Sequence, residues 1–266
     1  MVDNRRNILL ITSDQWRADC LSTFGHPCVE TPVYDRLIED AVAFRNHYSV
    51  CAPCGPARAS LLTGMYLQNH RSVRNGTPLD DRHTNVAREV RKAGYLPKLF
   101  GYTDTSLDPR RYDETTVLSL GYENLMPGFE EGLLLPAEQP TSWLNYLREQ
   151  GYDFRSLDEA YAPVDNYPGA KDRGRTFAPP RYSAEHSQTA FLTREVIDYV
   201  TNAGDGWFVH LSYLRPHPPF IAPEPYNSMY DPASVPLPVR ASAPTEQAVT
   251  DTVVSRERIY SRSRRP

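Results

Sequence analysis

The 266-residue sequence predicts an α/β domain with a mostly parallel central sheet. One observation is the apolar run Asn7–Ser13, whose short length and β-branched residues are typical of a buried central strand. Another is the best helical pattern of the chain, Ser183–Asn202, which leads into a further strand pattern at Trp207–Leu214. Asp14 follows the first strand, at the sheet edge where ligands of open α/β sheets bind.

The first quarter of the chain alternates helices, strands and loops. Thr31 precedes a helix that carries Pro in its first turn and keeps helical apolar spacing as far as Ala43. Phe44–Val50 is predicted to be a second, partly aromatic strand, and Cys51–Ala57 a loop rich in Pro and Gly. A short helix follows over Ala57–Thr63 and is stopped by Gly64.

The remaining elements are shorter or less regular. Asn85–Ala93 is predicted to be a helix, and Pro97–Phe100 a short strand behind it. Trp143–Glu149 is a further predicted helix, and Asp153–Pro180 is a polar stretch that we expect to be a long surface excursion. Ser183 is positioned to cap the long helix. The last predicted strand is followed by a rigid loop, Arg215-Pro-His-Pro-Pro219. Asp104–Phe129 shows only a weak secondary-structure pattern.

Charge and hydropathy exclude several classes of protein. Lys and Arg number 29 against 33 Asp and Glu, so the formal charge is −4 and a basic nucleic-acid binder is not expected. No apolar run approaches the ~18 residues of a membrane span, so no membrane partner is expected. The polar start, Met1–Asn7, lacks the apolar core of a secretory signal, so a cytoplasmic location is expected.

The C-terminal end differs from the rest of the chain. Residues 1–235 carry the regular patterns and are predicted to form the main folded portion, whereas 236–266 are predicted to be a linker and an Arg-rich mobile tail. The stretch Arg256–Pro266 holds five Arg and a single acid, Glu257, with poor apolar periodicity. Solvated disorder is a better interpretation of this tail than a nucleic-acid patch.

The loop at Cys51-Ala-Pro-Cys54-Gly-Pro-Ala-Arg58 is the most informative stretch for chemistry. Cys54 lies just before a helix whose N-terminus offers N–H groups and partial positive charge to an anion. Arg58 is one turn away, and its guanidinium fork can reach the same anion. A nucleophile, a helix N-terminus and an Arg beside a carboxylate at a strand end suit attack on a tetrahedral oxyanion ester.

Cys54-x-Pro56-x-Arg58, followed by Ala-Ser-Leu-Leu-Thr-Gly64, resembles the active-site motif of the sulfatase family, in the alkaline-phosphatase-like superfamily. Asn7–Gln15 resembles the first strand and metal-binding turn of that family, and Thr31–Phe44 its first helix. The resemblance implies an alkaline-phosphatase-like α/β/α sandwich, of which this chain would be the N-terminal part. Gln15 in place of a second Asp, and Gly101-Tyr-Thr in the sulfate-pocket segment, are similar to the phosphonate monoester hydrolase and phosphodiesterase branch.

The resemblance assigns Cys54 to a formylglycine nucleophile, made from the thiol by a formylglycine-generating enzyme. Asp14, Gln15 and the modified Cys54 would be ligands of one divalent metal ion, Mn²⁺, Ca²⁺, Mg²⁺ or Zn²⁺; the hard oxygen ligands argue against a soft-metal site. Arg58 would hold the aldehyde hydrate. The implied substrates are small anionic esters: phosphonate monoesters, phosphodiesters or sulfate esters.

Three further side chains would face the substrate. Asn75 and Tyr102 would contact its oxyanion, and His217 would be the general acid or an oxyanion stabiliser, because imidazole suits proton transfer near neutral pH. Asp104 is a departure, since the phosphonate monoester hydrolase branch commonly has an uncharged residue there. An acid at this position would repel an anionic substrate or pair with a nearby Arg.

A second interpretation is a catalytically incomplete fragment. Family members are roughly twice as long, and their remaining metal ligands, an adjacent Asp-His, with a following Lys, come from the C-terminal half. The sequence contains no Asp-His dipeptide. Half a metal site binds weakly. An incomplete sheet also leaves an unpaired edge, which invites aggregation or a homo-oligomer.

A third interpretation concerns the cysteines. Cys51-x-x-Cys54 superficially resembles a thioredoxin-like redox pair, and Cys20, His26 and Cys28 would join it in a zinc protein. The residues after Cys54 have no role in a redox motif, and the spacing between Cys20 and Cys28 is unusual for zinc. We therefore expect Cys20, Cys28 and Cys51 to be inert.

Overall fold

A computed structural model describes residues 5–111, 123, 125–174 and 176–237. It divides into two compact units, Met1–Tyr230 and Asp231–Pro266. The predicted linker at 241–244 and the Arg-rich tail lie outside the described residues, as does most of the stretch with a weak signal after Asp104. No helix in the described ranges combines the length and the apolar character needed to cross a bilayer.

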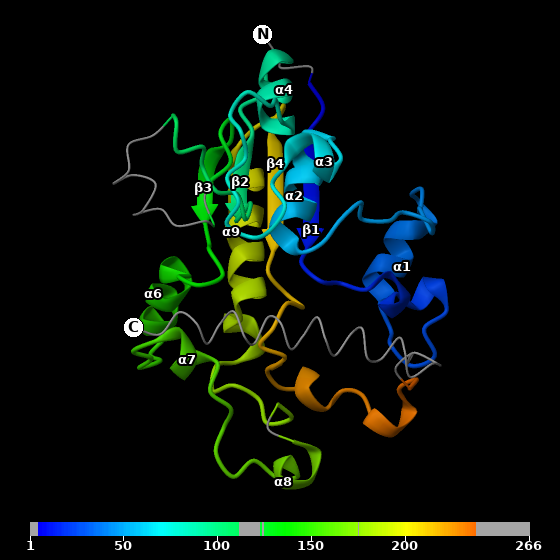
Figure 1. Ribbon diagram of the computed structural model, residues 1–266. Coiled ribbons are helices and arrows are strands. Elements are labelled where there is room, and N and C mark those ends of the chain that lie inside the picture. The colour runs from blue at the N-terminus through cyan, green and yellow to red at the C-terminus, as the bar shows by residue number, and fades with distance from the viewer. Residues whose placement is uncertain (1–4, 112–122, 124, 175, 238–266) are drawn as a thin grey trace, which may run out of the picture. The chain divides into compact units, whose positions relative to one another are not determined.

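The first unit is built on a parallel sheet, as the sequence predicts (Figure 1). Its four described strands are ordered β1-β4-β2-β3, and every neighbouring pair is parallel. The strands are β1 (Ile8–Ser13), β2 (Lys98–Gly101), β3 (Glu130–Leu134) and β4 (Phe208–Tyr213). Ser13 is opposite Tyr213, so β1 and β4 end level with each other. Side chains that follow these strands therefore meet at one edge of the sheet.

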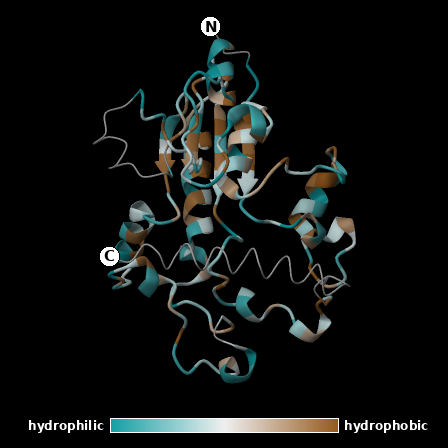
Figure 2. Ribbon diagram, viewed as in Figure 1, coloured by the Kyte–Doolittle hydropathy of each residue, from teal (hydrophilic) through white to brown (hydrophobic). Residues whose placement is uncertain are grey.

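Helices cover both faces of the sheet, and the strands supply the apolar layer between them (Figure 2). The helices nearest the two cores are α2 (Cys54–Thr63), α4 (Val86–Lys92), α6 (Thr141–Glu149) and α9 (Gln188–Asn202). Val209 of β4 packs in one core with α6 and α9, whereas Phe208 packs in the other with α2 and α4. This alternation along β4 follows from the two-residue period of a strand and creates the α/β/α layering.

The remaining helices are shorter, and the last of them, η5, belongs to the second unit. The α-helices among them are α1 (Pro32–Glu39), α3 (Leu67–His70), α7 (Leu157–Ala160) and α8 (Ala170–Arg173). The 3₁₀ helices are η1 (Ala18–Cys20), η2 (Ser22–Phe24), η3 (Ala184–His186), η4 (Tyr226–Ser228) and η5 (Pro232–Ser234).

Several predictions about the first elements are wrong. The predicted strand at Phe44–Val50 is irregular: it pairs with none of the described strands, and Phe44 and Tyr48 are 75% and 78% exposed. The helix that begins at Pro32 ends at Glu39 rather than at Ala43. By contrast α2 begins at Cys54, three residues earlier than predicted, because Gly55 and Pro56 both accept the conformation of a first helical turn.

Other corrections concern burial. β1 is not a buried central strand: it lies at one end of the described sheet, and Leu9 and Ile11 are 44% and 49% exposed. The predicted surface excursion at 153–180 places Phe154 and Ala160 in the core, where they belong to the same cluster as Trp143 and Leu147 of α6. The cap of α9 is Ser187, whose hydroxyl accepts from the N–H of Ala190, and not Ser183.

Candidate active site

The carboxyl ends of β1, β4 and β2 bring the first site residues together. Asp14 directly follows β1, and its N–H donates to the Tyr213 carbonyl at the end of β4, 3.0 Å away. Tyr102 follows β2 and is only 2% exposed; its hydroxyl donates to a carboxylate oxygen of Asp14 across 2.6 Å. Burial is the main cause of the raised pKa of Tyr102, so its hydroxyl keeps its proton and remains a donor.

Gly101 allows this approach. Its φ of +109° lies in the region that favours glycine, and a Cβ at this position would be 2.1 Å from the backbone oxygen of Ser212 in β4. A side chain here would force the two strand ends apart. Glycine at position 101 therefore allows the close approach of β2 to β4 that positions Tyr102.

Arg58 is the buried cation of the site. It lies on the second turn of α2, and its Nη1 donates to Ser212 Oγ at 2.7 Å and to the Tyr102 carbonyl at 3.2 Å. Its Nη2 lies 3.6 Å from a carboxylate oxygen of Asp14. The guanidinium also lies over the Tyr102 ring, 4.3 Å from the ring centre. A planar fork can hold these several partners at once, which a lysine ammonium cannot.

Cys54 is the first residue of α2, and Asn75 holds the turn around it. The Asn75 side chain donates from Nδ2 to Cys54 Sγ at 3.0 Å and accepts at Oδ1 from the N–H of Gly55 at 2.9 Å. A Cβ on Gly55 would be 3.0 Å from that Asn75 oxygen, so glycine leaves room for the contact.

The start of α2 differs from the sequence-based expectation of free N–H groups for an anion. The N–H of Gly55 is taken by Asn75, Pro56 has no N–H, and Ala57 donates to the Pro53 carbonyl. The start of α2 therefore offers fewer free N–H groups to an anion than the sequence suggests.

Asp104 is the buried acid beside Cys54. It is 5% exposed, has a φ of +51°, and neither of its carboxylate oxygens has a hydrogen-bond partner in the described structure. Burial raises the pKa of Asp104, while the adjacent Cys54 thiol, which lies outside hydrogen-bond geometry, and the charge of Arg58 act in the opposite direction. Burial and the neighbouring Asp104 carboxyl together raise the pKa of the Cys54 thiol to about 11. The unmodified thiol is therefore protonated at neutral pH and is a poor nucleophile.

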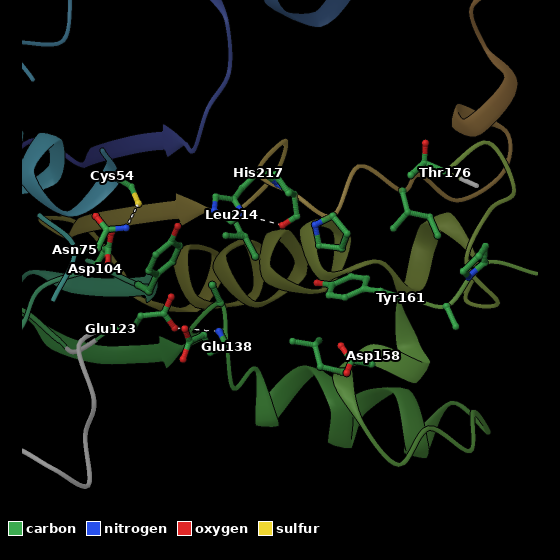
Figure 3. Close-up of a pocket in the computed structure, with 18 residues that line it drawn as sticks. Cys54, Asn75, Asp104, Glu123, Glu138, Asp158, Tyr161, Thr176, Leu214 and His217 are labelled. Carbon is green, nitrogen blue, oxygen red and sulfur yellow. Dashed lines mark hydrogen bonds between the residues drawn. The ribbon is translucent and has the colours of Figure 1, made fainter. Parts of the chain in front are cut away.

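His217 lies in the rigid loop after β4 and lines the same cavity as Cys54, Asn75, Tyr102 and Asp104 (Figure 3). Its Nδ1 is 2.7 Å from the carbonyl oxygen of Pro218, which fixes the N–H on Nδ1 and leaves Nε2 to accept or return a proton. Gln15 is exposed, has a φ of +61° and does not line this cavity. It lines a neighbouring cavity with Asp14, Arg58 and Cys54, so Cys54 borders both.

Comparison with known proteins identifies the family. Residues 6–249 match the family model described as Sulfatase. This chain belongs to the sulfatase family. The chain is 40% identical over 258 residues to the multifunctional alkaline phosphatase superfamily protein PehA of Trinickia caryophylli, a match to 92% of this chain and 48% of PehA. It is 28% identical to an arylsulfatase of Clostridium perfringens, over 88% of this chain and 48% of that protein.

Solved structures agree with this placement in the sulfatase family. The phosphonate monoester hydrolase of Agrobacterium radiobacter superposes with a TM-score of 0.85 at 46% identity. The phosphonate monoester hydrolase SpPMH of Silicibacter pomeroyi gives a TM-score of 0.81 at 48% identity. Each match covers 92% of this chain and 48% of the other. The chain thus has the alkaline-phosphatase-like fold and spans about half the length of the relatives it matches.

The described residues do not by themselves complete a metal site of the kind that the family resemblance implies. They contain no group of three or more His, Cys, Asp or Glu able to hold a metal ion. Asp14 already accepts from Tyr102 and lies near Arg58, and Gln15 adds a single amide oxygen. Hard divalent cations take about six or more oxygen ligands, so a cation here needs ligands beyond Asp14, Gln15 and residue 54.

The alternative interpretations of the cysteines find no support in the structure. All four cysteines are free. Cys51 Sγ lies 3.4 Å from Ser60 Oγ, whereas Cys54 Sγ accepts from Asn75, so the two thiols have different partners. Cys28 Sγ is 3.8 Å from His26 Nδ1, but no third ligand joins them in the described ranges.

Sequence reasoning missed two residues that contribute to the site. Ser212 is one strand residue before Tyr213, and its hydroxyl orients Arg58. The position of Ser212 near the carboxyl end of a predicted strand could have identified it as a candidate site residue. Glu123, which lines the cavity of Cys54, lies in a stretch without helix or strand periodicity, so no pattern pointed to it.

Proposed function

We propose that this chain is the nucleophile-bearing part of a formylglycine-dependent hydrolase of phosphonate monoesters, phosphodiesters or sulfate esters. The observation that carries the proposal is the convergence of Asp14, Arg58 and Asn75 on the turn that holds Cys54. The similarity to two phosphonate monoester hydrolases over 92% of the chain supports the choice of esters.

Conversion of Cys54 to formylglycine fits its surroundings. The thiol borders two cavities, accepts one hydrogen bond and forms no disulfide, so an aldehyde hydrate there has space and a donor. When formed, formylglycine supplies a hydroxyl nucleophile that the protonated thiol does not. The modification needs a formylglycine-generating enzyme as partner.

The side chains around residue 54 have separable roles in this proposal. Asn75 donates a hydrogen bond at the position of the reacting group, and Gly55 fixes the Asn75 amide orientation. Arg58 keeps Asp14 and the Tyr102 carbonyl in place, and its charge favours an anionic ester. His217 lines the same cavity, and its Nε2, which is not taken by the Pro218 carbonyl, is the candidate to protonate the leaving oxygen.

A divalent metal completes the proposal for the whole protein. Asp14 and Gln15 are the candidate ligands from this chain, and the cation would neutralise ester oxygens when bound. Because the described residues do not complete its coordination, we propose that the other ligands lie outside them.

The test is hydrolysis of an aryl phosphonate monoester and an aryl phosphodiester, with and without added Mn²⁺. We expect turnover that is lost in Cys54→Ala, lost on chelation, and reduced at least tenfold in His217→Gln and Asn75→Ala. A wild-type chain with formylglycine at position 54 and no turnover after Mn²⁺ addition supports the incomplete-fragment interpretation. Turnover that survives Cys54→Ala contradicts the proposal.

A further inference from the structure

The cavity beside Cys54 is lined by acids in a pattern that an anionic substrate alone does not explain. It has a volume of about 760 Å³, and four carboxylates line it, which we call the acidic wall: Asp104, Glu123, Glu138 and Asp158. Figure 3 shows Asp104 grouped with Cys54 and Asn75, with Glu123 and Glu138 side by side near them. Among the described residues no Lys or Arg lines this cavity.

Asp104 is the member of the acidic wall that points to a ligand. It is more than nine-tenths buried, it lines the cavity, and neither carboxylate oxygen has a hydrogen-bond partner. Buried carboxylates are normally paired or hydrogen-bonded, because removing them from water is costly. Arg58 makes its close contacts with Ser212, the Tyr102 carbonyl and Asp14. Its charge acts on Asp104, but among the described residues no hydrogen bond joins Asp104 to an Arg.

Glu123 extends the negative charge beyond Asp104. It is 8% exposed, and its Oε2 accepts the backbone N–H of Glu138, 3.0 Å away. Burial raises the pKa of Glu123, and the charges of Asp104 and Glu138 act in the same direction. For Asp104, the Cys54 thiol and then the charges of Arg58 and His217 favour the ionised form, whereas burial and the charge of Asp14 oppose it.

We propose that the cavity binds esters that carry an ammonium group a few bonds from the reacting phosphorus or sulfur, with Asp104 as the specificity-determining contact. The reacting anion would lie at Cys54 and Asn75, and the ammonium at Asp104 and Glu123. Such a zwitterion supplies the missing partner of the buried carboxylate and removes the repulsion that the acidic wall exerts on a simple anion. The ester part of this inference rests on the proposed function, whereas the ammonium preference can be measured by binding alone.

The binding test uses two ligands of nearly equal shape. 2-Aminoethylphosphonate and propylphosphonate differ only by an ammonium in place of a methyl group, and titration calorimetry gives the Kd of each for the full chain. We expect the ammonium ligand to bind about tenfold more tightly, which corresponds to ~1.4 kcal/mol. The ratio should fall towards one in Asp104→Asn and be retained in Asp104→Glu. Equal affinities in the wild type, or a ratio unchanged in Asp104→Asn, overturn the proposal.

A matched control separates a local contact from general attraction by a chain of net charge −4. Asp172→Asn removes an exposed acid that does not line the cavity and should leave the ratio unchanged. A ratio that falls equally in Asp172→Asn overturns the assignment to Asp104. If Asp104→Asn does not fold, judged by circular dichroism, Glu123→Gln replaces it and should lower the ratio in the same direction.

Turnover distinguishes this inference from the proposed function. The probes are p-nitrophenyl esters of the same two phosphonates, together with p-nitrophenyl 2-aminoethyl phosphate and p-nitrophenyl propyl phosphate. A higher kcat/KM for the ammonium member of the first or second pair shows whether the phosphonate or the alcohol side carries the ammonium. Equal kcat/KM in both pairs overturns the inference and leaves the hydrolase proposal standing. Selective binding of the ammonium ligand, with no turnover of any ester by the formylglycine-modified chain after Mn²⁺ addition, leaves the inference standing and supports the incomplete-fragment interpretation.

Discussion

The hydroxyl of Tyr102 donates to the carboxylate of Asp14 across 2.6 Å, and this bond joins the ends of two strands that are not neighbours in the sheet. β4 lies between β1 and β2, so the bond closes over the end of β4. Tyr102 is almost completely buried, and besides lining the cavity it holds the Asp14 carboxylate in place through its hydroxyl. The position of the candidate metal ligand thus depends on a residue that sequence reasoning assigned to the substrate.

Replacing Tyr102 tests this dependence. Tyr102→Phe removes one buried hydrogen bond to a charged acceptor, and we expect the free energy of unfolding to fall by about 2 kcal/mol. Urea denaturation measures the change. Tyr66→Phe is the control, because Tyr66 is 60% exposed, and it should be close to neutral. Equal effects of the two substitutions would contradict the role given to the Tyr102 hydroxyl.

The Arg58 guanidinium is predicted to be essential to the folded site. Arg58→Met leaves the buried Asp14 without its cation, and we expect a loss of roughly 3–5 kcal/mol in the free energy of unfolding. Arg58→Lys keeps the charge but loses the fork, so it should recover only part of this loss. Arg17→Gln, which breaks an exposed pair with Asp19, should change the urea midpoint little. A full rescue by lysine would show that charge alone matters.

Gly101 and Gly25 form a matched pair for backbone geometry. Both have positive φ, +109° and +94°, but a Cβ on Gly101 would collide with Ser212 whereas nothing lies within 4 Å of one on Gly25. Gly25→Ala should cost about 1 kcal/mol from φ strain alone. Gly101→Ala should cost clearly more and should displace Tyr102. Thermal and urea unfolding of both variants measure the difference; equal losses would refute the close approach at Gly101.

The reactivity of the unmodified Cys54 thiol should follow its environment. Its pKa is raised to about 11 by burial and by Asp104, and Asn75 acts in the opposite direction. Alkylation proceeds through the thiolate, so the rate at position 54 should rise about tenfold per pH unit from pH 7 and level off only near pH 11. Asp104→Asn removes a cause of the raised pKa and should speed alkylation at pH 8. Peptide mass spectrometry of iodoacetamide-treated protein measures this, and a slower variant would be inconsistent with the account.

The sequence was sufficient for the parallel sheet and for most of the residues around Cys54. Asp14 and Tyr102 follow strands whose apolar patterns are clear, so their meeting at one sheet edge follows from topology. β3 could not be predicted, because its sequence begins Glu130-Glu-Gly and shows no apolar pattern. Phe44–Val50 was wrongly predicted to be a strand because its aromatic pattern is typical of one, yet it pairs with none of the described strands. The burial of Asp104 depends on tertiary packing, which the local sequence does not reveal.

The central claim is that residue 54 acts as formylglycine and not as cysteine. The direct test is to coexpress the chain with a formylglycine-generating enzyme and to analyse the peptide containing residue 54 by mass spectrometry, with Cys54→Ala as the control. We predict an aldehyde at this position, trapped by a hydrazide probe, and ester turnover that increases with the fraction modified. An intact thiol at position 54 in protein that hydrolyses the esters would contradict the account.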